Sequence, residues 1–172
     1  MTMKGIKVTS SVVVISGKTS EAVVNTMSEE LVPLNLDILN REVMLVYAVD
    51  LNPSEPDAVA ATNTGVSASL STTSRTTIGA ISNTNVLAAA QKSIRAAGFL
   101  DGGVSFDDRS PETPTAADLP YIGIISTNDF FVQIQSFQGV NAGTVDWRLW
   151  TARATVSADI YAALVQGEAL SA

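Results

Sequence analysis

The residues that could do chemistry in this chain are few in kind. The sequence contains no His and no Cys, but it has 17 Asp and Glu residues and 10 Lys and Arg residues. Histidine is the commonest general base and transition-metal ligand, and cysteine supplies disulfides and thiolate metal sites. Catalytic triads built on His and the usual zinc sites are therefore excluded. We expect no enzyme activity, no catalytic residues and no cofactor.

Oxygen ligands remain, and they suggest a hard cation. The segment 101–120, DGGVSFDDRSPETPTAADLP, carries five acids: Asp101, Asp107, Asp108, Glu112 and Asp118. Carboxylate oxygens are the ligands that Ca²⁺ prefers, but the spacing does not match an EF-hand loop. A solvated acidic loop is the favoured interpretation and a weak Ca²⁺ or Mg²⁺ site is the alternative, so we assign no metal ligands.

Both tryptophans lie in one short stretch, VDWRLW, at 145–150. Side chains alternate between the two faces of a strand, so Trp147 shares the apolar face and is expected in the core. Arg148 and Trp150 share the other face, at a spacing that allows a cation–π contact. A half-exposed Trp beside an Arg is typical of the centre of a protein interface.

The outward aromatic residues leave one alternative open. The C-terminal tail of the chain could cover Trp150 through Tyr161 and Leu164. In DFFVQIQSF, 129–137, the alternation places Phe130 in the core and Phe131 on the polar face, where it needs some other cover. We therefore predict four interface residues, which are Arg148, Trp150, Phe131 and Tyr161.

Most of the chain has the pattern of β-strands. Apolar and β-branched runs predict strands over 6–16, 41–51, 66–82, 121–127, 129–137 and 143–157. The short turns between the last three predict an antiparallel meander. A helix is predicted over 84–97, with Thr84 or Asn85 as its N-cap and Gly98 after its end. The tail at 157–170 fits either a closing helix or a last strand.

Composition narrows the class of protein. Charged residues make up 16% of the chain, against a typical ~25%. The net charge of −7 argues against electrostatic binding of nucleic acid. No apolar run reaches the ~18 residues of a membrane span, and the short VVVI run does not make a signal peptide. We expect one domain over residues 1–172.

Several stretches together resemble the single jelly-roll capsid proteins of small icosahedral or layered viruses. They are REVMLVYAVDLNPSEPD, VSASLSTTSRTTI, the segment 84–97, DFFVQIQ and TARATVSADIYAAL. The resemblance implies a β-sandwich that packs side by side with copies of itself in a virion. The chain lacks the Arg/Lys-rich arm with which many such proteins hold a genome. Other shell proteins or a lipid layer would then stand between shell and genome.

The sequence thus predicts an all-β antiparallel sandwich, jelly-roll-like, with roughly eight strands, one short helix and, in one of the two alternatives, a helical tail. The predicted function is a self-assembling shell subunit, a viral capsid protein whose partners are its own copies. The alternative is a β-sandwich module that binds carbohydrate or Ca²⁺, with Trp150 and Tyr161 stacking on a sugar.

Overall fold

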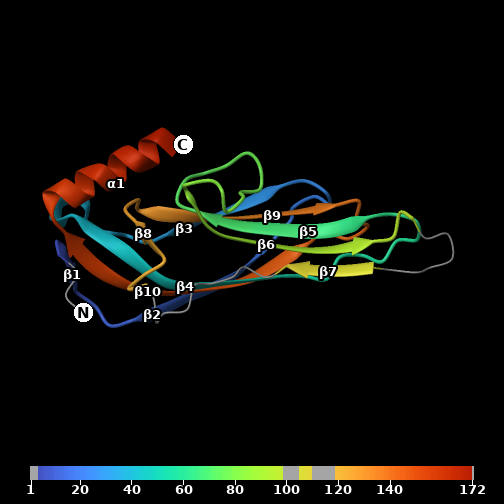
Figure 1. The fold of residues 1–172 in the computed structure, drawn as a ribbon, viewed down its shortest axis with the longest axis horizontal. Helices are drawn as coiled ribbons and strands as arrows, with labels where there is room; N and C mark the ends of the chain where they lie inside the picture. The colour runs from blue at the N-terminus through green and yellow to red at the C-terminus, as the bar shows by residue number, and fades with distance from the viewer. Residues whose placement is uncertain (1–3, 99–104, 110–118, 172) are drawn as a thin grey trace.

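Two antiparallel sheets pack face to face in the computed structural model, which describes residues 4–98, 105–109 and 119–171 (Figure 1). Sheet A contains β1 (Ile6–Val8), β2 (Val13–Ser20), β4 (Glu42–Pro53), β8 (Gly123–Ile125) and β10 (Thr144–Val156). Sheet B contains β3 (Ser28–Pro33), β5 (Thr64–Ser71), β6 (Val86–Arg95), β7 (Ser105–Arg109) and β9 (Asp129–Phe137). A 3₁₀ turn, η1 (Ile38–Asn40), precedes β4, and the helix α1 (Ala158–Ser171) follows β10. The predicted all-β sandwich is confirmed.

The strand pairing is that of a jelly roll. Four antiparallel pairs are nested one inside the next along the chain: β2 with β10, β3 with β9, β4 with β8, and β5 with β6. Successive pairs fall alternately in sheet A and sheet B. A long hairpin that is rolled up in this way gives the eight-stranded double sheet of a jelly roll. The strands β1 and β7 extend sheet A and sheet B beyond these eight.

The main core lies between the two inner faces. Phe130, Val132 and Ile134 of β9 are fully buried and belong to one cluster with Leu149 of β10 and Leu70 of β5. The intervening residues of each strand point outward, as the alternation of a strand requires. Burial of this continuous aliphatic and aromatic layer is the dominant stabilising term of the sandwich.

The helix predicted over 84–97 is wrong, because this segment forms the strand β6. Ala88 and Ala90 face the core, where they lie opposite Leu70 and Ala68 of β5. Alanine favours helices intrinsically, but that preference is a few tenths of a kcal/mol per residue, so tertiary packing readily overrides it. Asn85, a predicted N-cap, instead accepts a hydrogen bond from Arg75 Nη1 at 2.9 Å.

The predicted meander is also wrong. β8 and β10 both pair with β4 in sheet A, whereas β9 between them in sequence lies in sheet B. The short turns therefore cross between the layers and do not join neighbouring strands. Three predicted bounds change as well: 6–16 divides into β1 and β2, the strand over 66–82 ends at Ser71, and 105–109 within the acidic segment is the strand β7.

The helix α1 settles the open alternative for the tail in favour of a helix. It lies at one end of the molecule (Figure 1). Ile160, Tyr161 and Leu164 pack there on a second apolar cluster, which contains the buried residues Val43, Leu45, Ala154 and Val156. These four lie on the outer face of sheet A, so the helix covers one half of that face.

Candidate functional site

The other half of the outer face of sheet A has no cover among the described residues, and we call it the bare face. Nine outward residues define it: Val14, Ser16 and Lys18 of β2, Asp146, Arg148 and Trp150 of β10, and Ala48, Asp50 and Asn52 of β4. All are exposed except Trp150 and Ala48, which are half-buried. A register shift between Trp150 and Thr151 makes Tyr47 an extra residue on β4, and this bulge marks the boundary with the half that α1 covers.

Arg148 and Trp150 interact as the sequence predicts. The guanidinium carbon of Arg148 lies 5.8 Å from the centre of the Trp150 ring. Side chains two residues apart on one strand share a face, so the strand itself sets this geometry. A cation over an indole at this distance is worth about 0.5–1 kcal/mol where water reaches it. The contact holds the Trp150 ring in place on the surface without burying it.

Opposite charges alternate along the bare face. Arg148 lies opposite Asp50 of β4, and Asp146 lies opposite Lys18 of β2. Cross-strand pairs of opposite charge stabilise a sheet modestly, by roughly 0.2–1 kcal/mol each. The bare face therefore carries charges of both signs and has no basic or acidic patch.

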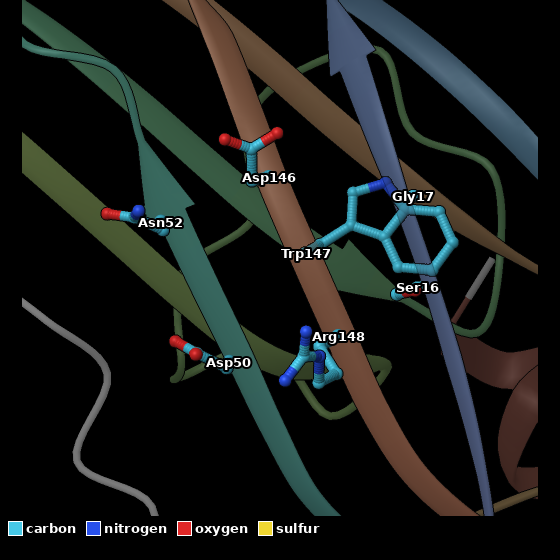
Figure 2. Close-up of a pocket in the computed structure, with 7 residues that line it drawn as sticks. All are labelled: Ser16, Gly17, Asp50, Asn52, Asp146, Trp147 and Arg148. Carbon is cyan, nitrogen blue, oxygen red and sulfur yellow. The ribbon is translucent and has the colours of Figure 1, made fainter.

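A shallow depression of about 480 Å³ lies at the charged end of the bare face. Figure 2 shows Asp146 and Arg148 on β10, Asp50 and Asn52 on β4, and the Trp147 indole lying across β2 beside Gly17. Any side chain at position 17 would collide with the Trp147 ring, so this close approach requires glycine. Trp147 is 5% exposed, as predicted for a core residue, and its Nε1 donates to Thr19 Oγ1 at 3.0 Å.

The chemistry available in this depression is binding. It offers two exposed carboxylates and one guanidinium, and the described part of the chain brings no three acidic side chains together as a metal site. The side chains of the acidic segment, including Asp101, Asp107, Asp108, Glu112 and Asp118, lie outside the described residues. The weak cation site of the sequence interpretation therefore stays a prediction.

The four predicted interface residues do not form one surface. Arg148 and Trp150 are together on the bare face. Phe131 is half-buried on the outer face of sheet B, where it lies opposite Leu31 and Ser71. Tyr161 is a half-buried residue of α1 and packs on a cluster that does not include Trp150. The tail therefore covers Val43 and its neighbours, whereas Trp150 and Tyr161 do not share the sugar platform that the alternative function requires.

A second cavity of about 560 Å³ lies between α1 and the adjoining end of the sandwich. Leu87, Ile122 and Leu164 are among its apolar lining residues, and Thr72 and Glu168 are among its polar ones. The Thr72 hydroxyl is buried without a hydrogen-bond partner among the described residues. Burial raises the pKa of the Glu168 carboxyl, and the charge of Asp129 adds to that rise, although the hydrogen bond from Ser126 Oγ at 2.8 Å opposes it.

Sequence reasoning missed a set of buried polar residues on the outer face of sheet B. Gln133 is fully buried there and bonds to Ser69, Ser71 and Glu29. Nearer one end of the sandwich, Glu21 is 6% exposed and accepts a hydrogen bond from the backbone amide of Gly143 at 2.6 Å. Polar residues at strand spacing give no sign of burial, because a solvated face has the same pattern.

Comparison with known proteins is uninformative about function. No family profile and no curated protein matches the chain. A solved structure that is similar comes from Desmodium yellow mottle tymovirus, with 10% sequence identity over 86% of this chain and 89% of that one, at a TM-score of 0.34. So low a score carries no weight, and the jelly-roll assignment rests on the strand pairing of this chain alone. None of the described helices is long and apolar enough to cross a membrane.

Proposed function

We propose that this protein is a structural subunit that assembles with copies of itself into a shell, as the capsid protein of a virion. The observation that carries the proposal is the bare face, on which the half-buried Trp150 lies beside Arg148 among charges of both signs. Tryptophan and arginine are the residues most enriched at the energetic centres of interfaces. Jelly rolls are a common architecture of viral capsid domains, which agrees with this function.

The same features favour protein over nucleic acid as the partner. The chain carries a net charge of −7, and the bare face alternates in sign. Phosphate binding depends on clustered Lys and Arg, so a genome would be held by other means. In a virion, other shell proteins or a lipid layer would lie between this subunit and the genome.

Size-exclusion chromatography with light scattering, followed by negative-stain microscopy, tests the proposal. We expect the purified chain to form oligomers or particles in a manner that depends on concentration. A chain that stays monomeric at high concentration, with no particles at any salt concentration, contradicts the proposal. A monomer that bound sugars or Ca²⁺ would favour the binding-module alternative.

A Trp150→Ala variant then tests the role of the bare face. We expect it to lose assembly while its circular dichroism and unfolding midpoint stay close to those of the parent, because Trp150 lies on the outer face of sheet A and outside both apolar clusters. Leu39→Ala is the matched control, since Leu39 is a 95% exposed apolar residue on η1, away from the bare face. If Trp150→Ala assembles normally, the bare face is not part of the contact. If the variant unfolds, Trp150 belongs to the core.

A further inference from the structure

The strand β2 has an open edge. Among the described residues it pairs only with β10, so the backbone groups on its other side have no strand partner. Val13 and Val14 begin this strand and Val12 precedes it; these three valines are 50%, 50% and 59% exposed, respectively. Unpaired backbone groups beside exposed aliphatic side chains form a template for pairing with another strand.

Val13 and Val14 are exposed because they lie at the edge of the sheet, since they point to opposite faces of it. Val13 lies opposite Thr151, which is buried, whereas Val14 lies opposite Trp150 on the bare face. Neighbouring residues of a strand point to opposite faces, yet both valines are half-exposed. Natural sheets protect an open edge with charges, proline or bulges, and the segment 12–17, VVVISG, has no charge and no proline.

Exposed apolar residues also occur on the neighbouring edge of sheet B. β2 contacts β3, which is the edge strand of sheet B on the same side. Leu31 of β3 is 53% exposed, and Val23, in the connection between the two strands, is 61% exposed.

We propose that β2 pairs antiparallel with β2 of a second copy, across a two-fold axis that lies between Val14 and the second copy's Val14. This inference rests on the proposed function and names the contact through which subunits would meet side by side. A two-fold contact joins the same patch on both copies, so the patch must complement itself. The sequence of β2 meets this condition in one register.

Charge selects that register. In a continuous sheet, paired residues must lie on the same face. One residue of β2 must therefore lie directly opposite its own copy, and we name the axis after that residue. An axis at Val14 places Val13 opposite Ile15 of the second copy and Lys18 opposite Ser10. An axis at Ile15 or Ser16 would place Lys18 opposite Val12 or Val14 and bury a charge against an aliphatic side chain. With the axis at Val14, Val14 meets Val14 and Val13 meets Ile15, so the central pairs are aliphatic and Lys18 faces a serine.

This pairing would join the two bare faces. Trp150 is the neighbour of Val14 on β10, so a row of Trp150, Val14, the second copy's Val14 and the second copy's Trp150 would cross the axis. Sheet A would continue from one subunit into the next. The edge strand and the bare face would then act as one contact surface.

Cysteine cross-linking tests the register directly, because the chain contains no native Cys. Facing residues of an antiparallel ladder have Cα atoms about 4.5–5.5 Å apart, which lies within the range of a disulfide. We expect Val14→Cys to form a disulfide-linked dimer under mild oxidation, and the dimer to be lost on reduction. Leu39→Cys and Val165→Cys, at exposed positions away from β2, are the matched controls and should stay unlinked.

A second pair of variants tests the energetics. Val14→Lys places two like charges on the axis and should raise the protein concentration needed for assembly by about tenfold or more. Val14→Thr keeps a β-branched residue at that position, so it should raise that concentration by less. Both variants should remain folded by circular dichroism, because the side chain of Val14 is half-exposed.

The outcomes separate this inference from the proposed function. If the parent chain assembles but Val14→Cys links no better than the controls and Val14→Lys assembles normally, the β2 contact is wrong and the shell function stands. If Val14→Cys links selectively while the parent forms only dimers, the contact stands and the shell function fails. If neither assembly nor selective linking is seen, both fail.

Discussion

The outer faces of the two sheets differ in how the rest of the chain covers them. On sheet B, the segment 72–85 folds back over the strands, and polar side chains seal it in place. On sheet A, α1 covers one half through apolar contacts and the other half is bare. The chain itself covers one outer face, whereas half of the other has no cover among the described residues.

Hydrogen bonds seal the face of sheet B. Gly79 N donates to Ser69 Oγ at 2.9 Å, and Ser74 Oγ donates to Glu29 Oε1 at 2.6 Å. Gln133 lies in the middle and connects Ser69, Ser71 and Glu29. Buried polar groups that satisfy one another fix one arrangement, whereas apolar contact tolerates several. The outer face of sheet B is therefore held in one arrangement by hydrogen bonds, whereas that of sheet A is covered only by apolar contacts or not at all.

The largest expected effect is the loss of this polar seal. Gln133→Ala removes the shared partner of two serines and a carboxylate on a fully buried surface. Each buried group left unsatisfied costs on the order of 1–3 kcal/mol, so we expect a loss of about 2–4 kcal/mol in the free energy of unfolding. Denaturant unfolding of the unassembled chain measures it.

Gln135→Ala is the matched control for that prediction. Gln135 lies two residues further along β9, so it shares the outward direction of Gln133, but it is only half-buried. We expect a change of about 0.5 kcal/mol or less. Equal effects of the two variants would mean that the network does not seal the face.

A smaller effect is expected where α1 covers sheet A. Leu164→Ala shortens a half-buried side chain that packs on the cluster of Val43 and Leu45. We expect a loss of about 1–2 kcal/mol in the free energy of unfolding, with faster hydrogen exchange confined to α1. Val165→Ala, at a neighbouring and 44% exposed position, is the control. A change in exchange throughout sheet A would show that the helix is part of the core and not a cover.

The smallest effect concerns the pH dependence of the α1 contact. The pKa of Glu168 is raised by burial, so the folded state holds this proton more firmly than the unfolded chain. The contribution of Glu168 to the free energy of unfolding is therefore full below the ordinary carboxyl pKa and is lost as the pH rises through the raised value. Glu168→Gln should stabilise α1 by roughly 0.5 kcal/mol or less at neutral pH, since solvent screens a half-exposed group.

The matched comparison for that prediction is a carboxylate with the opposite shift. A hydrogen bond from the backbone of Asn141 is the largest of several that lower the pKa of Asp57. Its contribution is present above the ordinary carboxyl pKa and is lost as the pH falls through the lowered value. Unfolding measured on both sides of the ordinary carboxyl pKa should separate the two variants. Glu168→Gln removes a loss of stability that occurs as the pH rises above that value, and Asp57→Asn removes a loss that occurs as the pH falls below it. The same slope change in both would contradict this assignment.

Much of the sandwich could be predicted from local pattern, and its arrangement could not. The strand over 129–137 has the predicted bounds, and alternation correctly separated Trp147 from Trp150. The helix prediction for 84–97 was wrong because repeated alanines fit the apolar stripe of a helix and the inner face of a tightly packed strand equally well. Which sheet a strand joins depends on partners distant in sequence, so the separation of Phe131 from Trp150 could not be read from either stretch. Nor could the burial of Gln133, which needs the segment 72–85 above it.

The nested pairing has a consequence for how the protein reaches its structure. Thr64 pairs with Ile94 in the innermost hairpin, whereas Val13 pairs with Thr151 near the opposite ends of the chain. Closing a loop costs more entropy as the loop lengthens, and folds rich in distant pairings form slowly. We expect β5 and β6 to join early and β2 to join last. In a newly made chain, the VVVI segment would therefore stay unpaired for longest. At high protein concentration, pairing of β2 with its own sheet would then compete with pairing of β2 with another chain.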